Sequence, residues 1–323
     1  MKALLVFSGG LDSMLAAQVI RAQDVDVLGL FFETPFFSSE KAKQSAAEIH
    51  LPLKIIDLTE AHLQIVRKPK YGYGGNMNPC IDCHALMLRS AGELLGSEEA
   101  SFIISGEVLG QRPMSQNFKA LSIVAKESGF SGLVLRPLCA KHLPVTVPEE
   151  RGWVKREELL GLSGRSRKPQ MELAGRLKIH RYPSPAGGCL LTDPIFSRRL
   201  KDLFSSGPGT TLREIELLKT GRHFRLGARA KLVVGRNKKE NEIIASFSRE
   251  SDLVLQVENI PGPTVLITGE TSSEDEALAL SIIASYSDAK EDQVVEVTMV
   301  RRGGERLGQG KKCDKGRFSA MMI

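Results

Sequence analysis

The chain has 323 residues, 42% of them apolar and 25% charged, which is the composition of a globular protein rather than of a disordered, collagen-like or disulfide-rich one. No apolar run approaches the roughly 18 residues that a spanning helix needs, and the N-terminus lacks a secretion signal, so we expect a cytoplasmic protein with no membrane partner. The 44 Lys and Arg residues exceed the 38 Asp and Glu residues, and their clustering favours a polyanionic partner.

The N-terminal stretch predicts a strand, a tight turn and a helix. The apolar run 3–7 is followed by Ser8-Gly9-Gly10-Leu11-Asp12-Ser13 and then by a helix-like segment at 14–20. Free N–H groups in such a turn, together with the dipole of the helix that follows, favour an anion. The turn lacks the Lys of a Walker A loop, which disfavours a P-loop kinase or GTPase.

This turn resembles the PP-loop of the ATP pyrophosphatases, which adenylate a carbonyl oxygen and release pyrophosphate. The resemblance implies that ATP binds here with Mg²⁺. It implies that the pyrophosphate is held by the backbone and hydroxyls of Ser8, Gly9, Gly10, Leu11 and Ser13. Asp12 is expected to hold Mg²⁺ and to take part in catalysis.

The first half of the chain alternates between strand and helix patterns. The expected strands are 25–32, 53–57, 101–105 and 133–136, and the expected helices are 40–50, 83–95 and 118–126. This rhythm predicts an α/β fold, a doubly wound parallel sheet with its ligand at the carboxyl ends of the strands. There the adenine is expected near Phe31, and Gly106 and Gln111 are expected to contact the nucleotide.

The loop after the fourth expected strand narrows the resemblance. Residues 106–116 spell G-E-V-L-G-Q-R-P-M-S-Q, and L-R-P-L follows at 135–138. Both segments are similar to those of tRNA 4-thiouridine synthases of the ThiI type. The resemblance implies an enzyme that adenylates a uridine carbonyl oxygen of tRNA and replaces that oxygen with sulfur. Arg112-Pro113-Met114 stands where those enzymes usually have small residues.

Five cysteines in a chain expected to be cytoplasmic indicate metal or thiol chemistry rather than disulfides. Cys80 and Cys83 form a Cys-x-x-Cys, and Cys189 sits in a second Gly-containing turn at 185–191. Covalent haem attachment at C-x-x-C-H would need export. Zinc needs a fourth ligand, for which His84 is a candidate.

Two further alternatives remain for Cys80, Cys83 and Cys189. One is a 4Fe-4S cluster held by three thiolates, whose open iron binds hydrosulfide, as in the iron–sulfur-dependent tRNA thiolases that these cysteines resemble. The other is a persulfide resolved by a second thiol, as proposed for 2-thiouridylases with a similar Asn-Pro-x-x-x-Cys segment. We favour the cluster, because persulfide-using relatives often carry a rhodanese domain. Cys83 and Cys189 are then expected to be catalytic, and the sulfur donor, sulfide or a cysteine desulfurase, is left open.

Basic segments provide the candidate RNA-binding residues of the first half. Lys68 and Lys70 precede a loop at 71–79 that is rich in Gly and Tyr, a composition suited to stacking on splayed bases. Arg165 and Arg167 precede an expected helix and could grip phosphates of either tRNA or ATP.

The second half has a different pattern. A Ser/Gly/Pro stretch at 204–209 predicts a linker, which divides the chain into a PP-loop domain at 1–204 and a smaller α+β domain at 210–323. Its expected elements are strands at 222–225, 231–234, 243–245, 253–257 and 264–267, a helix at 274–286 and a final strand at 294–300. The region resembles the RNA-binding domain of NFACT proteins, which implies tRNA contacts from Arg236, Lys238 and Lys239.

Together these patterns predict an ATP-dependent tRNA uridine sulfurtransferase that makes 4-thiouridine, with a homodimer also compatible. One alternative is a 2-thiouridylase acting at the wobble uridine. The other is a non-catalytic RNA-binding quality-control factor with a vestigial nucleotide site.

Overall fold

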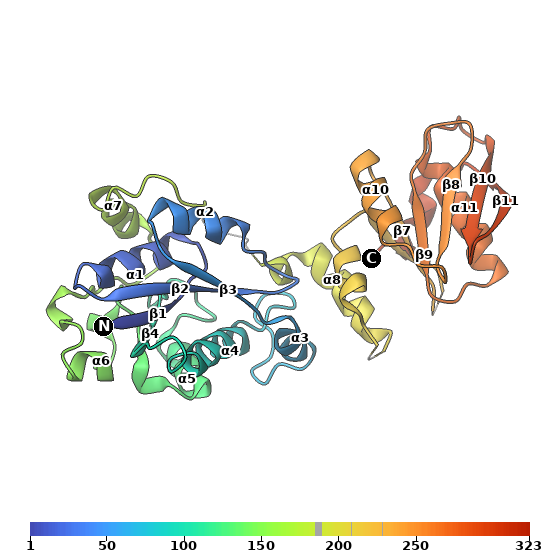
Figure 1. Ribbon diagram of the computed structural model, residues 1–323. Helices are drawn as coiled ribbons and strands as arrows, with labels where there is room; N and C mark the ends of the chain where they lie inside the picture. The colour runs from blue at the N-terminus through green and yellow to red at the C-terminus, as the bar shows by residue number, and fades with distance from the viewer. Residues whose placement is uncertain (185–188, 208, 228) are drawn as a thin grey trace. The chain divides into compact units, whose positions relative to one another are not determined.

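A computed structural model describes residues 1–184, 189–207, 209–227 and 229–323 (Figure 1). The contacts within it divide the chain into two compact units, Met1–Asp193 and Pro194–Ile323. The chain therefore enters the second unit before α8 (Pro194–Ser205) and not at the linker predicted from residues 204–209. The reason is that α8 packs with the second unit, where Asp202 pairs with Arg225 of β6 (Arg222–Arg225).

The first unit contains a parallel sheet with the strand order β3-β2-β1-β4-β5. Its strands are β1 (Lys2–Val6), β2 (Asp26–Glu33), β3 (Leu53–Asp57), β4 (Phe102–Ser105) and β5 (Val134–Leu135). The predicted doubly wound α/β fold is confirmed. The strand order reverses between β1 and β4, so the loops that follow these two strands lie next to each other at the carboxyl edge.

Helices cover both faces of this sheet (Figure 1). They are α1 (Leu11–Arg21), α2 (Glu40–Glu48), α3 (Thr59–Arg67), α4 (Cys80–Glu93), α5 (Phe118–Ser128), α6 (Val147–Glu150) and α7 (Lys168–Arg176). Apolar residues of α1, α2 and α7 join the core on one face, and those of α4 and α5 join the core on the other. Short 3-10 helices span Ser131–Leu133, Ala140–His142, Arg156–Glu158 and Leu190–Thr192.

The second unit is an antiparallel sheet with the order β11-β10-β8-β9-β7-β6. Its other strands are β7 (Lys231–Val234), β8 (Leu253–Val257), β9 (Val265–Thr268), β10 (Val294–Arg301) and β11 (Gly304–Lys311). Its remaining helices are α9 (Leu212–Leu217), α10 (Lys238–Ser246), α11 (Ser273–Tyr286) and a 3-10 helix at Lys315–Met321. Helix α11 buries Ala279, Ile282 and Ile283 in the core on one face, while Leu217 and Ile244 of α9 and α10 cover part of the other.

Two local predictions in this unit are wrong. The expected strand at 243–245 lies within α10, because the Asn237 side chain caps the helix by accepting a hydrogen bond from Glu240 N at 3.0 Å. The expected final strand is followed by β11, which pairs with β10 along its whole length. Arg302 and Gly303 have φ of 53° and 72°, the left-handed pair that a tight two-residue hairpin requires.

Candidate functional site

The turn between β1 and α1 depends on Gly9. Gly9 has φ of 74°, and a Cβ there would lie 2.7 Å from the Ala42 Cα of α2, so a side chain would push the turn off that helix. Ser45 fixes the contact by donating to Gly9 O at 2.7 Å. Helix α1 then begins with Gly10 as its N-cap, and because Gly10 has no side chain to cap the first turn, those N–H groups suit an anion.

The loop after β4 approaches this turn closely. A Cβ on Gly106 would lie 2.8 Å from both Cα and N of Ser13, so only glycine allows the two loops to touch. Ser13 Oγ donates to Gly10 O at 2.8 Å, and Gly10 N donates to Ser8 Oγ at 3.3 Å. Both hydroxyls are thereby held at the same edge of the sheet.

A cavity of about 730 Å³ opens at this edge. It is lined by eight of the nine residues predicted to hold ATP: Ser8, Gly10, Leu11, Asp12, Ser13, Phe31, Gly106 and Gln111. The ninth, Gly9, packs on α2 instead. Cys80, Cys83 and Cys189 also line the cavity. Predicted site residues from distant segments therefore line one cavity. The turn residues 185–188 before Cys189 lie outside the described part of the chain.

Asp12 lies in the cavity with one carboxylate oxygen engaged. Gln111 Nε2 donates to Asp12 Oδ2 at 3.0 Å, whereas Oδ1 is buried and has no hydrogen-bond partner among the described residues. Burial raises the pKa of Asp12, and the Gln111 hydrogen bond and the charges of Arg167 and Arg112 oppose that rise. A buried carboxylate oxygen without a partner is a suitable ligand for Mg²⁺.

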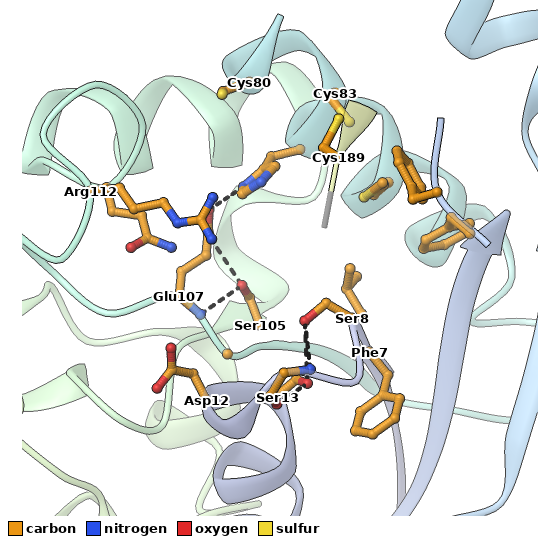
Figure 2. Close-up of a pocket in the computed structure, with 18 of the residues that line it drawn as sticks. Phe7, Ser8, Asp12, Ser13, Cys80, Cys83, Ser105, Glu107, Arg112 and Cys189 are labelled. Carbon is orange, nitrogen blue, oxygen red and sulfur yellow. Dashed lines mark hydrogen bonds and ion pairs between the residues drawn. The ribbon is translucent and has the colours of Figure 1, made fainter. Parts of the chain in front are cut away.

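The three thiols gather on the other side of the cavity, and Figure 2 shows Cys83 next to Cys189 with Cys80 nearby. Cys80 and Cys83 lie in the first turn of α4, so the helix expected at 83–95 begins three residues earlier, at Cys80. Burial raises the pKa of each thiol, that of Cys189 to about 11. The neighbouring Cys189 and Cys80 raise the pKa of Cys83 further. Bound cations would favour the thiolates.

His62 of α3 is a site residue that the sequence patterns did not reveal. Its Nε2 lies 3.2 Å from Cys83 Sγ, and its ring packs against Phe36 and Phe37 with both centroid separations at 5.6 Å. Burial lowers the pKa of His62 to about 4, so the ring is neutral at pH 7. A lone histidine in the sequence carries no signal of such a contact.

Glu107 lines the same cavity, and three neighbouring side chains hold its carboxylate. Its carboxylate is 2.7 Å from His84 Nδ1, 2.8 Å from Arg136 Nε and 3.0 Å from Ser105 Oγ. Although burial disfavours the charged form, Arg136 and His84 lower the pKa of Glu107 to about 2. His84, the candidate fourth zinc ligand, is thus hydrogen-bonded to Glu107 through Nδ1.

The predicted RNA-binding residues are divided among three places. Arg165 and Arg167 line the cavity. Lys68 and Lys70 lie on the surface of the first unit, where Lys70 pairs with Glu127 at 2.8 Å. In the second unit, Arg236 pairs with Glu240, and Lys238 and Lys239 are exposed at the start of α10. Any RNA contact made by Arg236, Lys238 or Lys239 would therefore be a contact of the second unit.

Two kinds of feature are absent from the described residues. No set of three His, Cys, Asp or Glu side chains in this part of the chain has the arrangement of a metal-ion site. No helix within the same residues is both long and apolar enough to cross a membrane.

Known protein families match one segment in each of the two units. Residues 1–142 match the family described as "Thiamine biosynthesis protein (ThiI)". Residues 1–142 form a ThiI-type PP-loop domain. This ThiI-type domain includes the PP-loop turn, Cys80, Cys83 and the loop of Gln111, whereas Cys189 lies beyond the matched range. Residues 221–314 match the family described as "NFACT protein RNA binding domain".

Curated relatives match part of the chain. A protein named "Probable tRNA sulfurtransferase" from Thermoanaerobacter sp. (strain X514) is 27% identical over 148 residues, covering 42% of this chain and 36% of the relative. The protein of the same name from Staphylococcus saprophyticus is 30% identical over 146 residues, covering 42% and 34%. The chain thus spans about a third of the length of these relatives. A solved structure described as "Crystal structure of a 4-thiouridine synthetase - RNA complex with bound ATP" is 19% identical, covering 67% of this chain and 52% of that one, with a TM-score of 0.36.

Proposed function

We propose that the protein is an ATP-dependent tRNA sulfurtransferase. The observation that carries this proposal is that the PP-loop turn and the thiols of Cys80, Cys83 and Cys189 line one cavity. A nucleotide held at the turn has its phosphates on the same side of the sheet as the thiols. The ThiI match of residues 1–142 and the names of the curated relatives support the assignment.

In the first step, a uridine carbonyl oxygen attacks the α-phosphorus of ATP. An oxygen–phosphorus bond forms, the bond to the β-phosphate breaks, pyrophosphate leaves, and the ring N3 loses its proton. The open N–H groups at the start of α1 and the hydroxyls of Ser8 and Ser13 would bind the departing pyrophosphate. Mg²⁺ bound at Asp12 would offset the charge of the phosphates.

In the second step, hydrosulfide attacks the activated ring carbon. A carbon–sulfur bond forms, the carbon–oxygen bond breaks with its electron pair passing to AMP, and the proton brought by hydrosulfide ends on N3. The apolar side chains of Phe31, Phe37 and Met87 in the cavity lining would reduce the access of water at this stage and so disfavour hydrolysis of the adenylated base.

The three thiols are the proposed ligands of an iron–sulfur cluster, although in this structure they do not stand in the arrangement of a metal-ion site. They are soft ligands, they line one cavity, and burial leaves each protonated unless cations are bound, as the raised pKa values of Cys80, Cys83 and Cys189 indicate. A 4Fe-4S cluster held by these residues would supply an open iron to carry sulfide. A persulfide on one of the same thiols is the alternative.

The second unit is proposed to bind tRNA. Its NFACT-type match covers β6 to β11, and the exposed Lys238 and Lys239 at the start of α10 offer cations to the phosphate backbone. Among uridine positions, the ThiI-type match favours C4, which would give 4-thiouridine.

The test is a reaction of anaerobically purified protein with ATP, Mg²⁺, sulfide and an unmodified tRNA transcript. We expect tRNA-dependent release of pyrophosphate and 4-thiouridine in the digested tRNA by mass spectrometry. 2-Thiouridine instead would assign the protein to the wobble-uridine enzymes. Release of neither pyrophosphate nor thiouridine, with tRNA still bound, would make it an RNA-binding factor.

The cluster is tested separately by iron and acid-labile sulfide content. Cys189→Ala is expected to lower both relative to wild type, and the matched control Cys313→Ala is expected to retain them, because Cys313 lies in the second unit against Ser285. Full iron in Cys189→Ala would exclude the three-thiolate site.

A further inference from the structure

Arg112 belongs to a loop that backbone hydrogen bonds close, and these bonds fix the position of its Cα. Gly110 N donates to Gln116 O at 2.7 Å, and Gln116 N donates to Arg112 O at 2.8 Å. Pro113 follows Arg112 and restricts its backbone to extended conformations. The preceding residue, Gln111, is tied to Asp12 in the PP-loop turn. Arg112 is consequently presented to the cavity, where Figure 2 shows its side chain reaching in.

The charge of Arg112 acts on both halves of the site. It lowers the pKa of Asp12 on the nucleotide side and of Cys80 and Cys189 on the thiol side, in each case against the larger effect of burial. Arg167, also in the cavity lining, acts on Asp12. Figure 2 shows the Arg112 side chain between Asp12 and the thiols, and Arg112 and Arg167 both line the cavity.

The guanidinium of Arg112 is available to a ligand. Its side chain makes no hydrogen bond or ion pair with a residue that the structure describes, in contrast to Arg136, which is held by Glu107 at 2.8 Å. A guanidinium offers several N–H donors in a planar fork, and its preferred partner is a phosphate or carboxylate. An anion bound in the middle of the cavity would accept hydrogen bonds from these N–H groups.

We propose that Arg112 binds the α-phosphate of the adenylated uridine and stabilises its charge as sulfur displaces AMP. The inference rests on the proposed function, because it assigns a step of that reaction. In this step the new carbon–sulfur bond forms, the carbon–oxygen bond breaks and its electron pair passes to the phosphate oxygen of AMP. Negative charge thus moves from the thiol side to the phosphate. A cation placed between the two suits this transfer better than it suits pyrophosphate release.

The test separates the two steps in a single turnover. Arg112→Gln and Arg112→Lys are compared with wild type and with Arg176→Gln, a control that removes an exposed arginine of α7. Pyrophosphate and thiolated tRNA are measured in the same reaction, and thermal unfolding checks that each variant is folded. For Arg112→Gln we expect pyrophosphate release near the wild-type rate and thiolation slower by about 10²-fold. Arg112→Lys should recover part of the thiolation, because it keeps the charge without the fork.

Other results would overturn the assignment in distinguishable ways. If pyrophosphate release and thiolation fall together in Arg112→Gln, the residue acts in ATP binding or adenylation. If neither falls, it has no role in the reaction. If wild-type protein makes no thiouridine, the proposed function itself fails, and this inference fails with it.

Discussion

Asp12 illustrates how a single residue can serve function at a cost to stability. Its carboxylate is buried at the PP-loop turn, with Oδ2 accepting from Gln111 and Oδ1 left without a partner among the described residues. Burial raises its pKa, which means that the folded state disfavours the charged form. An uncharged residue of the same shape would remove this cost and also remove the proposed ligand for Mg²⁺.

We therefore predict opposite effects for Asp12→Asn. Tm should rise at pH 7, and pyrophosphate release should fall by about 10²-fold or more. Because a raised folded-state pKa makes ionisation unfavourable, the gain in Tm should shrink as the pH is lowered and wild-type Asp12 takes up a proton. Calorimetry from pH 7 to pH 4 checks this, with the exposed Asp288→Asn as control. A lower Tm for Asp12→Asn at pH 7 would contradict it.

Residues with a local motif were predictable, and residues defined by tertiary contacts were not. The motifs formed by Ser8 to Ser13 and by Cys80 and Cys83 can be recognised from their residue types and spacing. Nearly all of these residues line the cavity. His62 reaches Cys83 from another helix, and no sequence pattern marks that contact. In the sequence, Arg112 stands out only as a departure from small residues, because its place in the cavity depends on two strands that are far apart in sequence.

At the scale of elements, strands were predicted well because their burial pattern is local. β3, β6, β7 and β8 have the bounds expected from the sequence. The failures have physical causes. The Ile243-Ile244 pair reads as a strand, but the Asn237 cap and the burial of Ile244 favour a helix. β11 contains three glycines and several charges, so its strand character comes from pairing with β10 rather than from propensity.

The strand ends of the first sheet are joined by Glu107 and Arg136, which follow β4 and β5 respectively. Glu107 has a pKa of about 2, below its usual 4.5, so its ionised form stabilises the fold. This contribution is present above about pH 4.5 and is lost as the pH falls toward about 2. The shift corresponds to about 3 kcal/mol.

We predict that Glu107→Gln lowers the free energy of unfolding by about 3 kcal/mol at pH 7, because Arg136 then remains buried without its partner. The difference from wild type should narrow below about pH 4.5. Urea denaturation at several pH values measures it, with the exposed Glu157→Gln as control. A difference that stays constant down to pH 3 would show that the ion pair does not account for the stabilisation.

At the scale of the whole molecule, α8 decides where the chain can be divided. Asp202 of α8 accepts from Arg225 and lies 3.6 Å from the buried Lys231 Nζ, and Arg199 donates to Leu218 O at 2.8 Å. Removal of α8 would leave Lys231 buried without its carboxylate. The second unit therefore needs residues that the sequence pattern assigns to the first.

We predict that a fragment spanning residues 194–323 unfolds cooperatively, and that a fragment spanning 210–323 is less stable by at least about 3 kcal/mol. Urea denaturation followed by circular dichroism compares the two. In the full-length chain, Asp202→Asn should destabilise the second unit in the same direction, while Asp288→Asn should not. Equal stability of the two fragments would show that α8 is dispensable.

The position of Cys189 has a consequence for biosynthesis. Cys80 and Cys83 are carried by one helix, but Cys189 reaches them through Leu190 and Leu191, whose backbones bond to Phe36 O and Met77 N at 3.2 Å. A nascent chain emerging from the ribosome thus presents two thiols long before the third. Maturation of any inorganic centre must then wait until the segment at 189–193 has docked, and a polypeptide that stalls earlier would remain unloaded.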